Sequence, residues 1–401
     1  MLIRNANIVQ ENGEIVTRDI LVVDGTIENI AEKIEINVDM EILDAECNLV
    51  LPGIIDVHTH MRDPGLSHKE DFMTGSMACA KGGVTTFIDM PNTVPNTTTE
   101  EILRQKKMVL KDKSYVDYGF HFGGSRNNNS TEIEKVKAEV ASTKVFLNMS
   151  TGDMLVEEEK TLEALFGSSK VVSVHAEGEM VKRAIELGKK YKKPLYLCHL
   201  STAEEVELLR EAKKQGIEVY GEVAPHHLFL SVEDRDEKFL RMKPELKEKT
   251  DCEALWEGLK DGTIDAIGTD HAPHLKEEKM EKLTFGVPGI EHSLEMMLRG
   301  VNENKLSYRR LTAVMSENPS KIFGIKNKGF LKVGYDGDLV IVDLKNRRKI
   351  SDDEVVSKCG WTPYKDKETG GTVLTTILRG NIVYNRGRFY NKKGKEVKYN
   401  G

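Results

Sequence analysis

The chain has 401 residues, of which 39% are hydrophobic and 31% are Asp, Glu, Lys or Arg. This length allows a large buried core, in one large domain or in a large and a small one. No apolar run approaches the roughly 18 residues that span a bilayer, so we expect a soluble globular protein with no membrane partner. The net charge of −7 argues against nucleic acid as the main partner.

The cysteines and the first residues bear on the cellular compartment. Five cysteines lie scattered along the chain without a Cys-x-x-Cys pair, so neither a disulfide framework nor a zinc-thiolate site is expected. The first residues run directly into an alternating pattern, without the charged and apolar regions of a signal peptide. We therefore expect a cytoplasmic protein.

The first fifty residues alternate apolar and polar side chains, as strands do. Leu2–Val9 and Asp19–Ile27 carry this pattern, and Asp24-Gly25 within the second run indicates a hairpin turn. This part of the chain is predicted to be a small β region.

From residue 52 to residue 329, short apolar runs alternate with stretches of helical spacing such as 203–214. The apolar runs, each predicted to be a strand, include 84–90, 144–147, 171–175, 195–199, 218–222 and 264–270. Repeated strand–helix units imply a parallel sheet covered on both faces. Their number suits an α/β fold of the (β/α)8 TIM-barrel type.

After residue 329 the β patterns return, at 338–343 and 375–383. Neither terminal β region is long enough to bury a core alone, so we expect the two to pack together as one small β-sandwich. The predicted organisation is a composite β-sandwich domain of residues 1–51 and 330–401, and a barrel domain of residues 52–329.

His58 and His60 stand two residues apart at the end of an apolar run that begins at Ile54. Side chains at positions i and i+2 of a strand point to the same face, so the two imidazoles can bind one metal ion. Two exposed or hydrogen-bonded histidines would give the same pattern, so this pair alone does not decide the matter.

Polar side chains recur at the ends of the other predicted strands. The set is His58, His60, Asn92, Lys144, His175, His199 and Asp270. Barrel enzymes place their catalytic groups at this edge of the sheet. Each residue singly could cap a helix or bond to the backbone, but four imidazoles and a carboxylate together match the ligands that divalent metals such as zinc prefer.

Lys144 is the unusual member of this set because an ammonium group is not a metal ligand. One interpretation is a lysine that reaches from a strand end to water. The other is a lysine that has reacted with carbon dioxide to give a carbamate, a bidentate oxygen anion that could bridge two cations.

These residues lie in motifs that resemble those of the dihydroorotases, class I-like members of the amidohydrolase superfamily. The motifs, in chain order, are His58–Gly65, Asp89–Thr93, Lys144–Leu147, His175–Glu177, Cys198–Thr202, Ala224–Leu228 and Gly268–His274. Pro319–Gly324 and Trp361–Tyr364 extend the likeness into the tail. Several motifs are shared with hydantoinases, dihydropyrimidinases and allantoinases, whereas Arg62–Gly65 is more particular to dihydroorotases.

The resemblance implies a role for each residue. His58 and His60 would bind one Zn²⁺ ion and His175 and His199 a second, with carboxylated Lys144 as the bridge between them. Asp270 would bind the first metal and act as the catalytic acid and base. The implied metal ligands are therefore His58, His60, Lys144, His175, His199 and Asp270.

The resemblance also implies a substrate and a reaction. Arg62, Asn92 and His274 would hold a substrate carboxylate, and Gly286, Pro288 and Gly289 would belong to a substrate-contacting loop. The reaction would be the reversible cyclisation of N-carbamoyl-L-aspartate to (S)-dihydroorotate plus water, in de novo pyrimidine (UMP) biosynthesis. The partner is thus a small molecule, and a homo-oligomer or an association with another enzyme of the pathway is left open.

Some residues depart from the pattern or stay outside it. Lys243 stands where the family often has Asn or Arg, so it is either a substrate contact or a solvated loop lysine. His226 and His227 are assigned to a strand, where neighbours point to opposite faces, and are left out of the metal set. His68, His121 and His292 are expected to be non-catalytic.

Three functions are weighed. A dihydroorotase is favoured by Arg62, whose planar guanidinium suits a carboxylate. A dihydropyrimidinase or hydantoinase would keep the metals without this anion clamp. A non-catalytic scaffold on the same fold would be expected to have lost several ligands, whereas this chain keeps the whole implied set.

Overall fold

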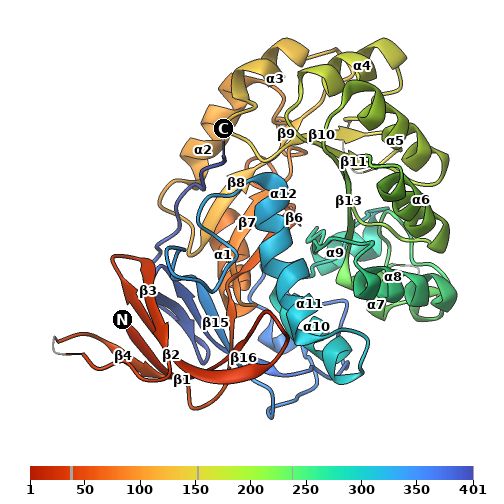
Figure 1. Ribbon diagram of the computed structural model, residues 1–401. Helices are drawn as coiled ribbons and strands as arrows, with labels where there is room; N and C mark the ends of the chain where they lie inside the picture. The colour runs from red at the N-terminus through yellow and green to blue at the C-terminus, as the bar shows by residue number, and fades with distance from the viewer. Residues whose placement is uncertain (37–38, 151–152, 237, 401) are drawn as a thin grey trace.

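A computed structural model describes residues 1–36, 39–150, 153–236 and 238–400. An arc of strands with helices outside it forms the larger part of the molecule, and a sheet region lies beside it at the lower left of Figure 1. Among the described residues, no helix combines the length and the apolar character that crossing a membrane requires.

The two ends of the chain build one sheet, with nine strands among the described residues. Its strands are β1 (Leu2–Val9), β2 (Ile15–Val23), β3 (Thr26–Ala31), β4 (Ile42–Asp44), β5 (Leu49–Pro52), β15 (Leu339–Asp343), β16 (Thr372–Leu378), β17 (Asn381–Asn385) and β18 (Arg388–Phe389). β5 pairs with β15, so the two ends share one hydrogen-bonded ladder. Ile3, Ile20, Leu339 and Ile377 from both ends meet in one buried cluster. The predicted β domain of both termini is confirmed, while its boundaries at 51/52 and 329/330 stay a prediction.

Two tight turns in this sheet follow from glycine positions. Asp24 and Gly25 join β2 to β3 with φ angles of 49° and 85°, which is the left-handed conformation that two-residue hairpin turns need. Arg379 and Gly380, with φ angles of 46° and 68°, form a second such turn between β16 and β17. The β pattern expected over 375–383 therefore covers the end of β16, this turn and the start of β17, because the chain reverses at Gly380.

The central part of the chain forms the barrel. Its strands are β6 (Ile54–Thr59), β7 (Val84–Asp89), β8 (Asp117–Phe120), β9 (Phe122–Gly123), β10 (Thr143–Phe146), β11 (Val172–His175), β12 (Leu195–Leu197), β13 (Val219–Val223) and β14 (Ala266–Ile267). β8 and β9 are one strand interrupted at His121, which gives eight parallel positions among the described residues. A parallel bridge between Thr59 and His271 joins the last strand back to the first. The predicted (β/α)8 barrel is confirmed.

Helices connect these strands and cover the outside of the barrel. They are α1 (Phe72–Lys81), α2 (Glu100–Leu110), α3 (Ser130–Val136), α4 (Glu159–Ser168), α5 (Glu179–Tyr191), α6 (Ala203–Lys214), α7 (Pro225–Phe229), α8 (Lys249–Asp261), α9 (Lys276–Glu281), α10 (Ser293–Asn302), α11 (Tyr308–Thr312), a π-helical turn (Ala313–Glu317) and α12 (Asn318–Phe323). Short 3₁₀ turns lie at Val232–Asp234, Ile290–His292 and Asp352–Glu354. In α6, Val206, Leu209 and Ala212 are buried against the strands.

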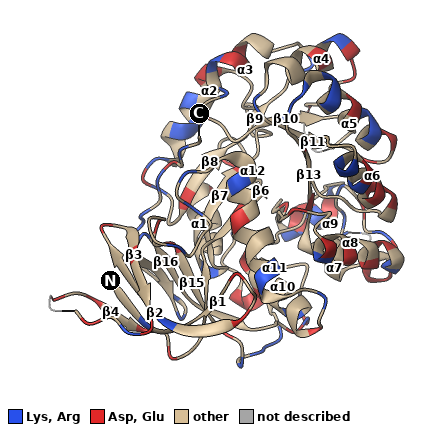
Figure 2. Cartoon of the chain, viewed as in Figure 1, with Lys and Arg blue, Asp and Glu red and all other residues tan. Residues whose placement is uncertain are grey.

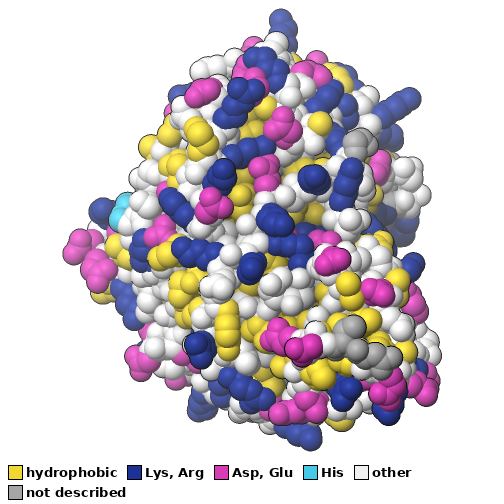
Figure 3. Space-filling model, turned by 90° about the vertical axis from the view of Figure 1, so that its left-hand side faces the viewer, with side chains coloured by type: hydrophobic (Ala, Val, Ile, Leu, Met, Phe, Trp, Pro, Cys, Tyr) yellow, Lys and Arg dark blue, Asp and Glu magenta, His cyan; other side chains and the backbone are white. Residues whose placement is uncertain are grey.

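The outward helix faces are charged. Figure 2 shows Lys and Arg beside Asp and Glu along α4, α5, α6 and α8, and ion pairs such as Lys182 with Glu179 join consecutive turns. On the face seen in Figure 3, hydrophobic atoms are broken up by charged side chains of both signs. The outside of the barrel is thus a solvated surface, and the chemistry-bearing side chains lie within.

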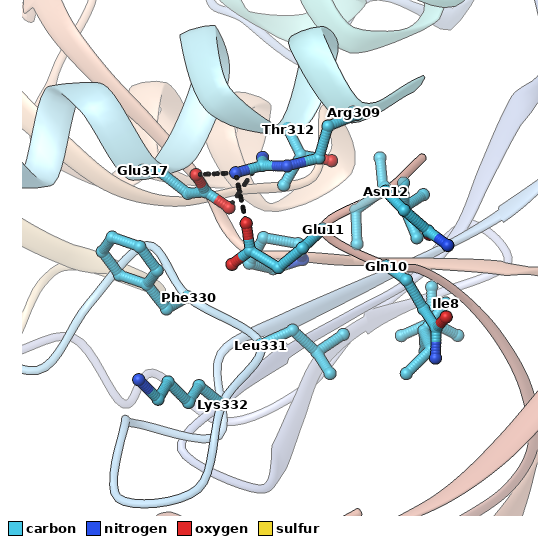
Figure 4. Close-up of a pocket in the computed structure, with 14 residues that line it drawn as sticks. Ile8, Gln10, Glu11, Asn12, Arg309, Thr312, Glu317, Phe330, Leu331 and Lys332 are labelled. Carbon is cyan, nitrogen blue, oxygen red and sulfur yellow. Dashed lines mark hydrogen bonds and ion pairs between the residues drawn. The ribbon is translucent and has the colours of Figure 1, made fainter. Parts of the chain in front are cut away.

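A pocket of about 560 Å³ lies at the seam between the sheet and the barrel (Figure 4). It borders Pro52, which precedes β6, at the end of the barrel opposite to His58 and His60. Arg309 reaches into it, but Nη2 of its guanidinium is already paired with Glu317 (2.9 Å) and Glu11 (3.4 Å). The pocket therefore offers no unpaired guanidinium, and the predicted site lies elsewhere.

Candidate metal and substrate site

The His-x-His pair sits at the carboxyl end of β6, the first barrel strand. His58 belongs to the strand and His60 follows it directly, and their side chains are 1% and 9% exposed. The two ring centroids are 5.5 Å apart. The i, i+2 spacing thus brings both imidazoles to the inside of the barrel, as the sequence predicted.

Hydrogen bonds orient both rings in the same way. Nδ1 of His58 lies 2.7 Å from Oε1 of Glu222, and Nδ1 of His60 lies 2.7 Å from Oδ1 of Asn92. Each Nδ1 therefore donates its proton to an oxygen acceptor, and each Nε2 is turned to the other side. Both Nε2 atoms face Oδ1 of Asp270, at 3.3 Å from His58 and 2.9 Å from His60.

The charges around this group favour a cation. Burial alone lowers the pKa of His58, but the carboxylates of Glu222 and Asp270 outweigh it and raise the pKa to about 10. Burial likewise raises the pKa of Asp270, yet His58 and His60 hold it well below its usual range. A positive charge, carried by a proton or by a metal ion, is therefore stabilised between the imidazoles and the carboxylate.

A second histidine pair lies on the neighbouring strands. His175 ends β11 and His199 follows β12, and Nδ1 of His175 is 2.8 Å from Nε2 of His199. The remaining ring nitrogens, Nε2 of His175 and Nδ1 of His199, are buried and have no partner within hydrogen-bond distance, although Oε1 of Glu177 lies 3.6 Å from Nε2 of His175. Because buried polar atoms almost always have partners, this arrangement points to a missing ligand.

Lys144, on β10, lies between the two pairs. Its side chain is only 1% exposed, so the interpretation in which it reaches water is wrong. Nζ donates to Sγ of Cys198 at 2.9 Å, a weak acceptor. Burial lowers the pKa of His175 and of His199, and the positive charge of Lys144 lowers both further.

These residues fit a divalent metal centre. The ring nitrogens of His58 and His60 and a carboxylate oxygen of Asp270 lie within 4.8 Å of one another, and such nitrogen and oxygen donors are typical zinc ligands. The unpartnered nitrogens of His175 and His199 supply the independent observation. The chain therefore carries a candidate metal centre at the carboxyl ends of the strands.

Arg62 is a buried guanidinium beside this centre. Its side chain is 3% exposed, and burial lowers its pKa to about 10. Nε donates to the carbonyl of Pro273 at 3.1 Å, and among the described residues no carboxylate lies within ion-pair distance of it. A carboxylate brought by a substrate would supply the partner that the protein leaves out.

His274 supports Arg62 as a neutral ring. Nζ of Lys69 donates to its Nδ1 at 3.2 Å, so Nε2 carries the proton and donates to the carbonyl of Phe285 at 3.0 Å. Burial, with the charges of Arg62 and Lys69, lowers the pKa of His274 to about 2. Nη2 of Arg62 lies 3.2 Å from the same Nε2, so the ring of His274 lies against the guanidinium.

A small cleft opens over Arg62 and Asp270. Its lining residues are His60, Arg62, Asn92, Ser150, Lys243, Asp270, Ala272, Phe285 and Gly286. Pro288 and Gly289 instead line a neighbouring cavity with His271, and the amide of Gly289 donates to Nδ1 of that histidine at 3.2 Å. Of the predicted loop residues, only Gly286 borders the cleft, and substrate contact by the three stays a prediction.

Three site residues have an uncommon backbone conformation. Arg62, His199 and Asp270 have φ angles of 62°, 36° and 47°, in the left-handed region that non-glycine residues rarely occupy. Such conformations persist where the surrounding structure holds a side chain in a functional direction. All three lie directly after barrel strands, where the chain turns into the loops above the barrel.

The sequence did not reveal Glu222 as part of the site. This fully buried residue of β13 accepts from His58, from the hydroxyl of Tyr196 (2.9 Å) and from the amide of His199 (3.0 Å). It thus connects both histidine pairs. The available signal was a glutamate at the end of the predicted strand 218–222.

The assignment of His226 and His227 to a strand is wrong. Both lie in the short helix α7, which Pro225 begins after β13, and their ring centroids are 4.4 Å apart. His227 Nε2 donates to the carbonyl of Pro244 at 3.0 Å. Proline at the first turn of a helix explains the error, since its fixed φ favours helix initiation there.

Comparisons with known proteins agree with this geometry. The model of the amidohydrolase family matches residues 49–383. The chain is 36% identical over 392 residues to a dihydroorotase of Methanosphaera stadtmanae, covering 89% of this chain and 90% of the relative. It is 38% identical over 391 residues to a dihydroorotase of Pyrococcus abyssi, covering 93% and 92%.

Solved structures show the same fold. The L-hydantoinase (dihydropyrimidinase) of Arthrobacter aurescens aligns with a TM-score of 0.92 at 31% identity over 99% of both chains. A dihydropyrimidinase of Brevibacillus agri aligns with a TM-score of 0.91 at 27% identity, covering 99% of this chain and 98% of the other. The chain therefore belongs to the amidohydrolase family and, within it, groups with the dihydroorotases.

Proposed function

We propose that this protein is a metal-dependent dihydroorotase, which interconverts N-carbamoyl-L-aspartate and (S)-dihydroorotate in pyrimidine biosynthesis. The observation that carries the proposal is Arg62, a buried guanidinium at the cleft with no carboxylate partner among the described residues. Dihydroorotate carries a ring carboxylate that such a guanidinium binds with two parallel hydrogen bonds. The dihydroorotase relatives support the same assignment.

Each side chain at the cleft would have its own role in the reaction. Arg62, with Asn92 and the neutral ring of His274 beside it, holds the substrate carboxylate and so fixes the ring over Asp270. Asp270, kept ionised by His58 and His60, takes a proton from the attacking water on a carboxylate oxygen. The same carboxyl group then gives this proton to the ring nitrogen that leaves.

For the cofactor we propose two Zn²⁺ ions per subunit. His58, His60 and Asp270 would hold the first and His175 and His199 the second, with Lys144 as a bridging carbamate. When bound, such ions lower the pKa of water and polarise a carbonyl group. Support for the carbamate is the position of Lys144, whose side chain is buried among the ligand candidates.

A hydantoinase or dihydropyrimidinase is the alternative, because the aligned solved structures carry those names. Hydantoin and dihydrouracil rings carry no carboxylate, and for such a ring Arg62 would stay a buried charge without a counter-ion. Desolvating an unpaired guanidinium is unfavourable, so the site geometry favours an anionic substrate.

The reverse reaction tests the proposal. Purified protein supplied with Zn²⁺ is incubated with N-carbamoyl-L-aspartate, and ring formation is followed by the absorbance of dihydroorotate. Closure of the ring at a rate proportional to enzyme concentration is expected. No ring closure by protein whose metal content has been verified would overturn the proposal.

A further inference from the structure

Two neighbouring segments form walls of the cleft. Lys243 comes from the segment 238–247, and Phe285 and Gly286 come from the segment after α9; all three border the same cleft as Arg62 and Asp270. Nζ of Lys243 lies 5.3 Å from the centre of the Phe285 ring. The relative position of these two walls therefore shapes the cleft.

Lys279, on α9, forms hydrogen bonds to the backbone of both walls. Its side chain is fully buried, at 0% exposed. Nζ donates to the carbonyls of Arg241 and Gly286, both at 2.9 Å, and a third contact reaches the carbonyl of Thr284 at 3.4 Å. The three donors of an ammonium are thus matched by three carbonyls. In the part of the chain that the structure describes, no carboxylate pairs with it.

Arg241 makes the connection in the opposite direction. Its Nη2 donates to the carbonyls of Lys279 and Lys282, at 2.7 and 2.8 Å, where α9 ends. The amide of Gly286 donates to the carbonyl of Arg241 at 2.9 Å. Each residue of this Arg241–Lys279 clamp therefore holds the backbone of the other.

The clamp is fixed to the segment that carries Asp270. Gly286 has a φ of 127°, and a Cβ atom there would lie 2.7 Å from both Cβ and the carbonyl oxygen of Ala272. The amide of Ala272 donates to the carbonyl of Val287 at 2.9 Å. A shift of the clamp would therefore reach the cleft directly.

Packing alone does not account for a lysine at this position. Nζ lies 5.8 Å from the centre of the Trp361 ring, so an apolar side chain could fill the same space without a buried charge. Burial, together with the charges of Arg241 and Arg62, lowers the pKa of Lys279 to about 7. What the lysine adds over an apolar residue is a set of directed hydrogen bonds to both walls.

The geometry points to Lys279 as a positioning residue, which holds the Lys243 wall and the Phe285–Gly286 wall in the relative position that binding of a cyclic amide substrate requires. The inference rests on the proposed function for its substrate, but the clamp itself is a property of the chain. Lys279 touches no reacting atom in this arrangement and acts through the two walls.

The test compares Lys279→Met with the matched control Lys282→Met. Lys282 lies one residue beyond α9, and its side chain is 66% exposed. For Lys279→Met we expect the KM for dihydroorotate to rise about ten-fold, with kcat changed less than about three-fold and metal content unchanged, because uniform substrate binding is lost. Simple destabilisation would instead lower kcat through the active fraction and leave KM unchanged.

Hydrogen exchange provides a readout that needs no substrate. The amide of Gly286 should exchange faster in Lys279→Met than in the wild type, and at the wild-type rate in Lys282→Met. If Lys279→Met does not fold, Arg241→Leu removes the reciprocal donors and should give the same directions of change. Unchanged KM together with unchanged exchange would overturn the clamp, whereas faster exchange in a protein without dihydroorotase activity would overturn only the proposed reaction.

Discussion

Nδ1 of His58 lies 2.7 Å from Oε1 of Glu222, so a buried carboxylate fixes the imidazole with Nε2 turned toward Asp270. The same carboxyl group accepts from the amide of His199, next to the second histidine pair. Glu222 thus orients residues of both pairs from one position on β13. The metal centre depends on a residue that need not touch a metal.

Replacing Glu222 by glutamine tests this dependence. The amide keeps the shape but loses the charge that holds the His58 proton on Nδ1, so metal affinity should fall about 10- to 100-fold. Competition with a chromogenic chelator measures the change. Glu218→Gln, at the exposed entry to the same strand, is the control. Equal affinity in both variants would contradict the orienting role.

Removal of metal should inactivate and destabilise the protein. His58, His60 and Asp270 gather two imidazoles and one carboxylate in a buried site, where a bound cation would gain all three as ligands. Because a ligand that binds only the folded state stabilises it, dialysis against a chelator should lower Tm by about 5 °C or more. Zn²⁺ should restore both Tm and activity. A metal-free sample with the full rate would exclude metal-dependent chemistry.

Lys144→Ala should remove the bridging carbamate. We expect loss of activity and of part of the bound metal, because alanine has no oxygen to offer to a cation. Short-chain carboxylic acids should restore part of the rate by supplying a carboxylate at the emptied position. The measurement is metal content and rate with and without added acid. Normal values in Lys144→Ala would refute the bridge.

Arg62→Met should change the substrate preference. Loss of the guanidinium removes a charged partner from the substrate carboxylate, so kcat/KM for dihydroorotate should fall on the order of 100-fold or more. The rate with dihydrouracil, which has no carboxylate, should stay within a few-fold. Arg104→Met, on the solvent face of α2 with a side chain 67% exposed, is the control. Equal losses with both substrates would argue for a general structural role of Arg62.

The sequence predicted the parts of the site that depend on local pattern. The i, i+2 spacing of His58 and His60, and the strand ends that carry His175 and His199, follow from strand periodicity and the barrel topology. The sequence could not show whether the side chain of Lys144 is buried or reaches water, because the two cases differ only in tertiary packing. The residues of an apolar run do not by themselves determine whether its end lies inside or outside the barrel.

The contacts that the sequence did not reveal are long-range. Glu222 and His58 are 164 residues apart, and Lys279 reaches Arg241 from a different loop. Neither glutamate nor lysine carries a local signal of burial, since both types are usually exposed. The strand prediction for His226 and His227 was wrong for a different reason. Pro225 begins a helix where the apolar run suggested a strand.

The lowered pKa of Lys279 also predicts that the stability of the protein depends on pH. Its pKa is lowered to about 7 in the folded protein from 10.5, so between these values the unfolded state binds more protons and stability rises with pH. From pH 7 to pH 9 the free energy of unfolding of the wild type should gain about 2 kcal/mol relative to Lys279→Met. Urea unfolding at both pH values measures this difference. A difference that stays constant or shrinks with rising pH would contradict the lowered pKa.

The central claim is that the chain hydrolyses a cyclic amide that carries a carboxylate. The most direct measurement is kcat/KM for dihydroorotate and for dihydrouracil, with the same zinc-supplemented protein under the same conditions. A strong preference for dihydroorotate is predicted, because only this substrate supplies the missing partner of Arg62. A preference for dihydrouracil would contradict the claim and place the protein with the hydantoinases.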